Sequence, residues 1–572
     1  MMRWIDCQLP VDERIENLRT ELSAKSPFPT AIANILVQRG YESLEQVKSF
    51  LRPETNELRD AWDLKDMDLA VNRILLAVER NERILIYGDY DVDGTTSVAL
   101  LTLFLEEWGI ETEYYIPDRY QEGYGLSYQG VDFAHDNGFH LVIALDCGTK
   151  AVDKAQVLAE RGIDFIIVDH HRPGSVLPTR AAMVNPMQDG CDYPCKALSA
   201  CGLTFKLIEC LNEMFSEAFP DRDPHLDPFE KYSDLVTLSI ACDIVPIVDE
   251  NRSIAAAGLK KLRSNPLPGL AALMALSDRE RSWNIGDLVF FLGPRINSAG
   301  RLRSARASVS LLLGDEAERD AFALALEGYN ESRKELDQAI TKEALKLIAE
   351  HPNGDKLPAT VLYRDGWHKG VIGIVASRLI EHHFRPTVLL TKSKDKWVGS
   401  GRSVPGFDLY SALDACREHI LQFGGHKYAA GLTVNDEDIA QFKEKFESVV
   451  AERITAEQTM PILEIAHRLN FRSVTAKFIR LMNMLAPFGP GNKEPVFLAE
   501  DVTVKEARIL KEDHVKFMLS QEGLTFEGIG FNLARRWEAV NSLRLHVAFQ
   551  PDIKRWKGNV YVQLRIIDFK AA

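Results

Sequence analysis

The sequence lacks any apolar run long enough to cross a bilayer, and it has few cysteines. Apolar stretches such as LVIAL at 141–145 fall far short of the roughly 20 residues that a membrane-spanning helix needs. Eight cysteines in 572 residues are too sparse for a disulfide framework. The first residues carry acids early and no extended apolar segment, unlike a secretory signal. These absences predict a cytoplasmic protein without a membrane partner.

The chain also lacks an excess of positive charge. Its formal net charge is −15, which argues against a general nucleic-acid coat protein. Two regions differ from the whole: residues 505–572 hold 12 Lys+Arg against 8 Asp+Glu, and residues 360–431 hold 10 against 6. Each region therefore has a local excess of +4, which permits a channel for a polyanion.

The length predicts about three or four domains. The expected fold class is α/β: a parallel-sheet domain, a second α/β domain, and a small antiparallel barrel at the C-terminus. We expect the following boundaries: a helical segment at 1–50, the first α/β domain at 51–314, a long connecting helix at 315–355, the second α/β domain at 356–453, and the barrel domain at 454–572.

Acidic side chains follow three successive strands of the expected parallel sheet. The expected strand in RILIYGD leads into Asp89, Asp91 and Asp93. The strand in HLVIALD ends at Asp146, and the strand in DFIIVDHH ends at Asp169, before the two histidines. Parallel strands joined by helices end at one edge of a sheet, where open α/β sheets bind ligands. The three strand ends therefore predict one shared site rather than three separate turns.

The residues of this expected site suit divalent cations. Asp91, Asp93, Asp146 and Asp243 offer carboxylates, and His170 and His171 offer imidazoles. Mixed oxygen and nitrogen ligands suit Mn²⁺ or Mg²⁺, with Zn²⁺ as a further option. Two such ions about 4 Å apart can activate water and stabilise a phosphoryl transition state. The cations would also make the cluster of like charges tolerable.

A phosphatase of another class competes for the same stretch. DVDGT, residues 91–95 after an apolar strand, also fits a haloacid-dehalogenase motif with Asp91 as nucleophile and Asp93 as general acid. That motif needs one Mg²⁺ and gives no role to the Asp-His-His sequence at 169–171. We therefore favour a site that binds two metal ions. A surface turn without a ligand is the alternative interpretation of the acidic stretch.

The order of the motifs resembles a known superfamily. GDYDVDG, LDCG, DHH, ACDIVP and FGGHKYAAG occur in the order typical of DHH phosphoesterases. Within that superfamily, YGDYDVDG, GPRINSAGRL and WHKGVIGIVASRL resemble the RecJ family of single-strand-specific 5′→3′ DNA exonucleases. The resemblance extends from about Arg39 to the C-terminus. Smaller DHH enzymes act on short nucleotides, so a small-nucleotide phosphodiesterase is a further alternative.

The resemblance implies roles for the acids and imidazoles. Asp91, Asp93, Asp146, His170 and Asp243 would bind two Mn²⁺ or Mg²⁺ ions per active site, with Asp146 as the bridge. Asp89 would be a ligand or a supporting acid. His171 would position the scissile phosphate, and Asp169 would orient a histidine. Asp146, His171 and Asp169 would thus carry the catalysis.

The resemblance also implies substrate contacts. The second α/β segment would be the DHH-associated domain, facing the metal site across a cleft, and the barrel would be an OB-fold with a basic groove and aromatic stacking residues. The expected contacts with phosphate or bases are Arg295, Arg301, Arg402, Ser403, Gly424, Gly425, His426, Lys554, Arg555 and Trp556, with Phe549 and Tyr561 as further stacking candidates near Lys557.

The implied role is in DNA recombination and repair, with release of 5′-mononucleotides. Single-stranded DNA is the expected substrate, and a single-strand-binding protein and a RecQ-type helicase are the expected partners. Strand polarity follows from the resemblance alone. The irregular spacing of Cys191, Cys195 and Cys201 favours free thiols over a zinc site.

Overall fold

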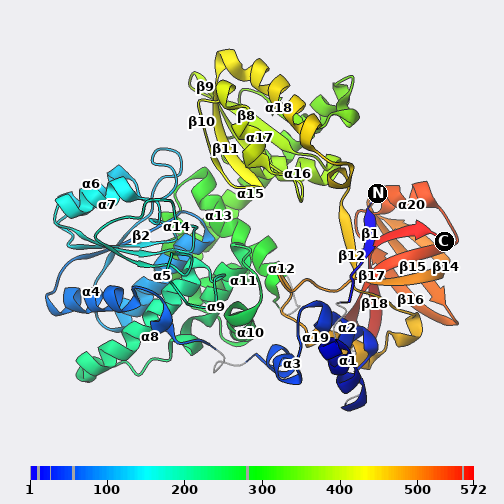
Figure 1. The fold of residues 1–572 in the computed structure, drawn as a ribbon, viewed down its shortest axis with the longest axis horizontal. Coiled ribbons are helices and arrows are strands. Elements are labelled where there is room, and N and C mark those ends of the chain that lie inside the picture. The colour runs from blue at the N-terminus through cyan, green and yellow to red at the C-terminus, as the bar shows by residue number, and fades with distance from the viewer. Residues whose placement is uncertain (1, 10–12, 26–27, 54–57, 278–282, 557–558) are drawn as a thin grey trace. The chain divides into compact units, whose positions relative to one another are not determined.

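The chain forms two compact units, each assembled from segments distant in the sequence (Figure 1). The computed structural model describes residues 2–9, 13–25, 28–53, 58–277, 283–556 and 559–572. The larger unit comprises Trp4–Gly293, Leu312–Arg319 and Leu463–Ala572. The smaller unit comprises Met1–Arg3, Pro294–Leu311 and Asp320–Ile462. Among the helices of these described residues, none is long and apolar enough to cross a membrane.

A parallel sheet forms the centre of the larger unit, as the alternation of strands and helices predicts. Its strand order is β3-β2-β4-β5-β6, and every neighbouring pair is parallel. The strands are β2 (Ile84–Gly88), β3 (Glu113–Tyr115), β4 (Leu141–Leu145), β5 (Asp164–Val168) and β6 (Ala181–Val184). Strands β2 and β4 are buried along their whole length, which explains why they are continuously apolar.

Helices connect these strands and continue the larger unit. The helices around the sheet are α4 (Met67–Glu79), α5 (Val92–Glu107), α6 (Tyr128–Asp136), α7 (Val152–Glu160) and α8 (Ala200–Ala218). The helices that follow are α9 (Pro228–Cys242), α10 (Asp249–Ser264), α11 (Pro268–Ala275), α12 (Ile285–Asp287) and the π-helix η4 (Leu288–Leu292). Asp243 caps the C-terminus of α9, where the sequence predicts it.

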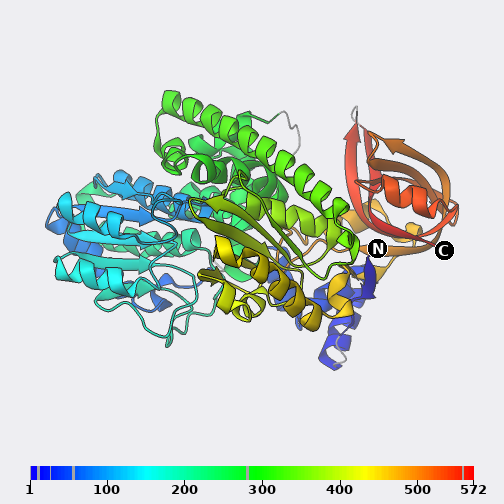
Figure 2. The ribbon, with the colours of Figure 1, turned by 90° about the horizontal axis from the view of Figure 1, so that it is seen from above.

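A closed five-stranded barrel lies at the C-terminal end of the chain (Figure 2). Pairing between β14 and β17 closes the barrel, and β16 and β18 pair in parallel. Its elements are β13 (His467–Arg468), β14 (Phe497–Leu510), β15 (His514–Gln521), β16 (Leu524–Gly530), α20 (Ala534–Val540), β17 (Arg544–Trp556) and β18 (Asn559–Ala571). The barrel is mostly antiparallel and has the OB architecture that the sequence analysis expects.

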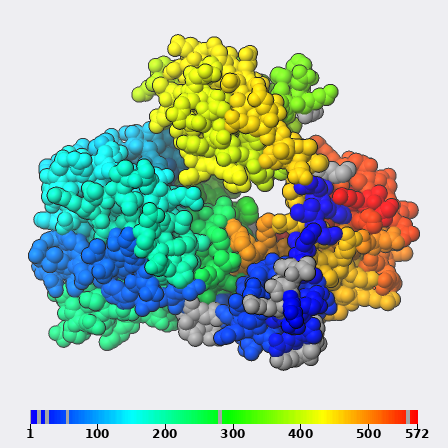
Figure 3. All heavy atoms as spheres, viewed as in Figure 1, coloured from blue at the N-terminus to red at the C-terminus, as the bar shows by residue number. Residues whose placement is uncertain are grey.

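The N-terminal helices share one hydrophobic core with this barrel. In Figure 3 the N-terminal atoms, in blue, lie beside atoms of the C-terminal segment, in orange and red. They are α1 (Glu13–Lys25), α2 (Thr30–Gln38) and α3 (Leu44–Leu51), and α19 (Ala476–Asn483) joins the same core. The expectation of an entirely helical N-terminus is wrong at its first residues, because Arg3–Asp6 form strand β1 beside β12 (Ile462–Ile465). Four residues alone carry too little helical periodicity, and the partner strand supplies their backbone hydrogen bonds.

The smaller unit contains the second α/β segment. Its sheet has the order β10-β11-β9-β8-β7, in which only β7 and β8 pair in parallel. The strands are β7 (Thr360–Tyr363), β8 (Thr387–Ser393), β9 (Lys396–Arg402), β10 (Gln422–Gly425) and β11 (Ala429–Asn435). The helices that lie wholly or mostly in this unit are α13 (Gly293–Leu302), α14 (Arg306–Leu313), α15 (Glu316–Glu350), α16 (Ile372–His383), α17 (Leu409–Asp414) and α18 (Ile439–Arg453). The 35-residue helix α15 is the long helix that the charged stretch predicts.

Candidate metal centre and substrate-binding residues

Strand ends of the larger unit bring the predicted acids and histidines together. Asp89 follows β2, Asp146 follows β4, and Asp169 follows β5. Asp91 caps the N-terminus of α5, and Asp243 caps the C-terminus of α9. Because β2, β4 and β5 are adjacent parallel strands, their carboxyl ends meet at one edge of the sheet.

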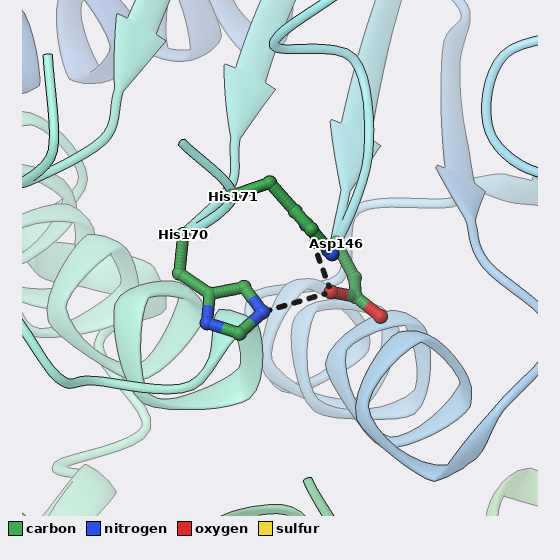
Figure 4. Close-up of side chains that lie close together, drawn as sticks. All are labelled: Asp146, His170 and His171. Atoms are coloured by element: carbon green, nitrogen blue, oxygen red, sulfur yellow. Dashed lines mark ion pairs between the residues drawn. The ribbon is translucent and has the colours of Figure 1, made fainter. Parts of the chain in front are cut away.

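His170 lies at the middle of this cluster. Its Nε2 is 3.4 Å from Oδ1 of Asp146, 3.6 Å from Oδ2 of Asp243 and 3.8 Å from Oδ2 of Asp93. Figure 4 shows His170 and His171 converging on the same carboxylate oxygen of Asp146, which is 3.9 Å from Nδ1 of His171. One imidazole thus contacts carboxylates from a strand end and from two helices.

The described residues contain three overlapping groups whose ligand atoms are close enough to share a cation. The groups are Asp89-Asp91-Asp146, Asp93-His170-Asp243 and Asp146-His170-His171. The first two groups have no member in common, so they define two separate positions. Asp146 and His170 link those positions through the third group. Asp146 and His170 thus lie where the two candidate positions adjoin, an arrangement that suits a pair of divalent cations.

The first turn of α5 sets the position of Asp91. Oδ1 of Asp91 accepts hydrogen bonds from the backbone N–H groups of Asp93 and Gly94, at 2.9 and 3.2 Å. This capping leaves the second carboxylate oxygen available to a ligand. Gly94 is required by close packing, since a Cβ there would lie 2.5 Å from the carbonyl oxygen of Asp89. The glycine lets the helix start directly against the strand end that carries Asp89.

Backbone N–H groups at the N-terminus of α8 donate hydrogen bonds to Asp93, a contact that no pattern in the sequence indicates. Oδ2 of Asp93 accepts from the N–H of Ala200 at 2.8 Å, and Oδ1 accepts from the N–H of Cys201 at 2.9 Å. The hydroxyl of Ser239 donates to the same carboxylate at 2.6 Å. Free N–H groups at a helix start favour a negative charge, and these donors fix the orientation of the Asp93 carboxylate.

Asp146 has a backbone conformation that non-glycine residues rarely adopt. Its φ is +63°, and its N–H donates to the carbonyl of Val168 on the neighbouring strand at 3.0 Å. Its own carbonyl accepts from the hydroxyl of Tyr124 at 3.1 Å. Strained backbone held in place by surrounding contacts is typical of functional sites. Here the turn directs the Asp146 side chain toward both histidines.

A hydrogen-bond network orients His171. Its Nδ1 lies 2.7 Å from Oδ1 of Asp169, whose Oδ2 accepts from the N–H of Thr149 at 3.1 Å. The hydroxyl of Tyr124 lies 3.1 Å from Nε2 of His171. Tyr124 comes from the loop after β3, and no spacing or motif in the sequence singles it out. The residue is 55% exposed, yet its hydroxyl is engaged in the cluster.

The electrostatics of the cluster fit bound cations. Burial and the charge of Asp93 raise the pKa of Asp243 to about 9. Burial and the neighbouring acids raise the pKa values of Asp89 and Asp146 well above their ordinary range. Oδ1 of Asp89 is buried without a hydrogen-bond partner, an orphaned acceptor that a cation would satisfy. The donor set, carboxylates with imidazole, matches Mn²⁺ or Mg²⁺.

Asp169 differs from the other acids. Burial alone would raise its pKa, but the hydrogen bond and charge of His171 outweigh burial and lower the pKa. Burial would conversely lower the pKa of His171, and the hydrogen bond to Asp169 raises it. The pair therefore behaves as a carboxylate with a protonated imidazole, which suits the orienting role expected of Asp169.

The smaller unit brings several of the expected phosphate contacts together. A guanidinium N–H of Arg301 donates to the carbonyl of Gly370 at 3.1 Å. Arg402 lies 3.0 Å from the position that a Cβ on Gly373 would take. Both arginines thus lie at residues 370–373, where α16 begins. Arg295 differs, because it is buried and pairs with Glu327, its Nη2 lying 3.0 Å from Oε1.

The remaining contacts of that set lie along neighbouring strands. The N–H of Ser403 donates to the carbonyl of Tyr428 at 3.0 Å, and Arg402 pairs with Ala429 between β9 and β11. Gly424 and Gly425 end β10, and His426 opens the turn that leads to β11. Arg402, Ser403 and the Gly-Gly-His turn are therefore adjacent in the folded unit.

The barrel residues that we expect to contact DNA differ in their exposure to solvent. The prediction that Phe549 stacks on bases is wrong. Phe549 is fully buried in the barrel core against Phe471 and Phe497, because its side of β17 faces inward. Tyr561 is 40% exposed, and Lys554 pairs with Asp552 at 3.5 Å. Arg555 and Trp556 end β17, with side chains outside the described part of the structure, and Lys557 lies outside the described residues altogether.

The thiols at 191, 195 and 201 belong to none of the candidate metal-binding groups. Cys191, Cys195 and Cys201 are buried free thiols. Among the described residues, the groups that could hold a metal contain aspartate and histidine only.

Three family models match the chain in succession. The DHH family N-terminal domain matches residues 83–240, the DHHA1 domain matches 356–452, and the RecJ OB domain matches 465–568. The first match covers the stretch that begins at Asp91, so it favours the DHH interpretation over the haloacid-dehalogenase alternative. The three matches agree with the parallel sheet, the second α/β segment and the barrel.

Curated relatives match over almost the whole chain. The single-stranded-DNA-specific exonuclease RecJ of Bacillus subtilis (strain 168) is 34% identical over 99% of this chain and 70% of its own length. The protein of the same name from Escherichia coli (strain K12) is 31% identical over 97% of this chain and 99% of its own length.

A solved structure has the same architecture. RecJ from Thermus thermophilus in complex with Mn²⁺ matches with a TM-score of 0.84 and 26% identity, covering 100% of this chain and 80% of that one. The complex of that protein with Mg²⁺ matches with a TM-score of 0.78 and 25% identity, covering 100% and 79%.

Proposed function

Because this chain belongs to the RecJ family, we propose that it is a metal-dependent exonuclease specific for single-stranded DNA. The observation that carries the proposal is the pair of candidate cation positions linked by Asp146 and His170. Hydrolysis of a phosphodiester needs such charge neutralisation on both sides of the phosphorus. The OB barrel adds a module whose general use is to hold single strands.

We assign the metal-binding role to two sets of residues. Asp89, Asp91 and Asp146 would hold one Mn²⁺ or Mg²⁺ ion, and Asp93, His170 and Asp243 would hold the second. Bound ions supply a lowered pKa for water and stabilisation of charge on the phosphoryl oxygens. The donors at the start of α8 hold the Asp93 carboxylate in place beside the second position.

His171 is the proposed contact with the scissile phosphate. Asp169 fixes the ring through Nδ1, so Nε2 can present a proton to a phosphoryl oxygen. Tyr124 holds Nε2 in the structure and lies where a phosphate would replace it as partner. Asp169 and Tyr124 are positioning residues, and His171 touches the substrate.

The proposed phosphate contacts outside the metal centre lie in the smaller unit. Arg301 and Arg402 lie at the start of α16, where N–H groups favour an anion. Arg295 would serve by positioning, because its charge is already paired with Glu327. Hydroxyl, backbone and imidazole donors would come from Ser403, Gly424, Gly425 and His426. The proposed contacts on the barrel are Lys554, Arg555 and Trp556.

We also propose the finer features of the reaction. These are attack from the 5′ end, release of 5′-mononucleotides and a role in recombination and repair. A single-strand-binding protein and a RecQ-type helicase are the proposed partners, because one coats and the other produces the single strand. Pull-down of each purified partner with the chain tests this assignment, and absence of both interactions would overturn it.

A degradation assay tests the central proposal. The substrates are 5′-labelled single-stranded DNA, 3′-labelled single-stranded DNA and blunt duplex, each with Mn²⁺ or Mg²⁺. Early release of a mononucleotide from the 5′ label, with no attack on the duplex, is the expected result. Asp146→Ala should be inactive, whereas the surface change Asp221→Ala should leave activity unchanged. Activity on small phosphate esters alone, or an active Asp146→Ala, would contradict the assignment.

A further inference from the structure

The edge of the sheet in the smaller unit carries aromatic rings that face solvent. Tyr410 is 41% exposed and Tyr428 is 50% exposed, although both belong to ordered elements. Tyr410 lies on α17, and Tyr428 lies in the turn between β10 and β11. Single exposed rings are common, but exposed rings that lie close together on a surface mark a candidate interaction site.

The two rings start from neighbouring backbone positions. The N–H of Leu409 donates to the carbonyl of Lys427 at 2.9 Å, and Tyr410 and Tyr428 each follow one of those residues. Phe423 on β10 contacts Tyr410 with ring centroids 5.2 Å apart. Three aromatic residues from α17, β10 and the turn therefore start from nearby backbone positions, and we call them the aromatic rim (Tyr410, Phe423 and Tyr428).

Cations accompany the rings. The guanidinium of Arg417 lies 5.7 Å from the ring centroid of Phe423, and the ammonium of Lys427 lies 5.6 Å from that of Tyr428. Residues 396–434, which include β9, α17, β10 and the turn, contain four Lys or Arg and three Asp or Glu. This stretch therefore has a local charge of +1 in a chain whose net charge is −15.

The rim also borders the proposed phosphate contacts. The carbonyl of Tyr428 accepts the N–H of Ser403, and the turn that holds Tyr428 begins at His426. Rings beside phosphate-binding groups match how single strands are held, with bases stacked on aromatic side chains and phosphates paired with cations. A peptide partner would have no use for the cations that accompany the rings unless it were acidic.

We propose that the aromatic rim stacks the bases of single-stranded DNA bound to the smaller unit. Tyr428 and the Tyr410-Phe423 pair would hold bases, while Lys427 would neutralise an adjoining phosphate. The charge of Arg417 is already paired with Asp414, 2.7 Å away. The inference rests on the proposed exonuclease function and adds the part of the surface that holds bases without regard to sequence. The expected cost of removing one ring is about 10-fold in affinity for single strands.

The test compares normal DNA with DNA that lacks bases. Affinities are measured on the full chain by fluorescence anisotropy in Ca²⁺, with a dT oligonucleotide and with one whose bases are replaced by abasic sites. The unchanged chain should bind the abasic strand about 10-fold or more weakly. Tyr428→Ala should weaken binding of dT and reduce the ratio between the two strands, whereas Tyr428→Phe should preserve both.

Further variants separate stacking from folding. Tyr410→Leu keeps apolar contact with Phe423 but removes the ring, and it should also reduce the ratio. Tyr363→Ala is the matched control, because Tyr363 is 38% exposed on β7 at the opposite edge of the same sheet. Melting temperatures verify that each variant folds. The control should retain both affinities.

The outcomes distinguish this inference from the proposed function. Cleavage of single-stranded DNA combined with equal affinity for normal and abasic strands would overturn the rim and leave the exonuclease standing. Absence of both binding and cleavage would overturn the exonuclease itself. A ratio unchanged in Tyr428→Ala and Tyr410→Leu would place the stacking elsewhere, on the barrel for example, and would also refute the rim.

Discussion

Replacing Asp243 by asparagine removes one ionisable group from a cluster of buried acids. In the chain without metal, Asp243 has like-charged neighbours within the cluster and a side chain only 25% exposed. Asparagine has nearly the same shape and carries no charge at any pH. We therefore expect Asp243→Asn to abolish or sharply reduce exonuclease activity while stabilising the metal-free protein.

The sign of the pH dependence follows from the raised pKa. The folded protein binds the Asp243 proton up to a pKa of about 9, against an ordinary value of 3.8. The folded state therefore holds that proton more tightly than the unfolded state does. Its stabilising effect is fully present below pH 3.8 and is lost as the pH rises toward about 9. Asparagine has no ionisable proton, so it adds no such pH dependence to the stability.

The magnitude can be estimated from this window. Each pH unit between 3.8 and about 9 costs the unchanged protein about 1.4 kcal/mol relative to the variant. Between about pH 5 and about pH 8 the gap would grow by at most about 4 kcal/mol, because the neighbouring acids share the shift. At about 2 °C per kcal/mol, this corresponds to at most about 8 °C in melting temperature.

The assay is thermal unfolding of chelated protein at pH 5, 6, 7 and 8. The variant should become increasingly more stable than the unchanged protein as the pH rises. Adding Mn²⁺ at pH 8 should stabilise the unchanged protein and reduce the gap. The surface variant Asp221→Asn is the control and should track the unchanged protein. A gap that is constant with pH, or that shrinks as the pH rises, would refute the reasoning.

Three further changes test other parts of the site and fold. Asp169→Asn should lower kcat about 10- to 100-fold and move the alkaline limb of the kcat profile to lower pH, because the raised pKa that keeps His171 protonated depends on Asp169. A loss confined to Mn²⁺ affinity in metal titrations would contradict this. Gly94→Ala should eliminate Mn²⁺ binding measured by calorimetry, since its Cβ would lie 2.5 Å from a backbone oxygen of Asp89; retained affinity would disprove the packing argument. Arg252→Lys should destabilise the larger unit by about 3 kcal/mol in denaturant unfolding, because the guanidinium donates to carbonyls of Phe50, Leu485 and Ala486. The change Lys260→Arg at an exposed position is the control. Equal stability of the two variants would show that the hydrogen bonds of the Arg252 guanidinium contribute little.

The gathering of acids at one edge of the sheet can be predicted from the sequence because it depends on local patterns. Continuous apolar strands followed by Asp89, Asp146 and Asp169 indicate a parallel sheet with acids at one edge, and the structure has that arrangement. The position of Asp243 at a helix end is equally readable, since the apolar periodicity of α9 stops there. These features need only strand order and side-chain type.

The supporting contacts are not readable from the sequence. The donors to Asp93 come from α8 and α9, at Ala200 and Ser239, far along the chain. Tyr124 reaches His171 from a loop with no regular periodicity. Phe549 shows the converse error, because an aromatic residue near lysines and arginines in the sequence can still face the interior of a barrel.

By itself, the sequence determined the chemical type of the site, because a cluster of carboxylates at strand ends is tolerable only with cations beside it. It also determined the α/β class and the barrel, since these follow from local periodicity. The tertiary structure alone decided which backbone donors hold Asp93, which histidine is fixed and that the N-terminal helices join the barrel core. Those outcomes depend on contacts between residues far apart in the chain, which no local pattern encodes.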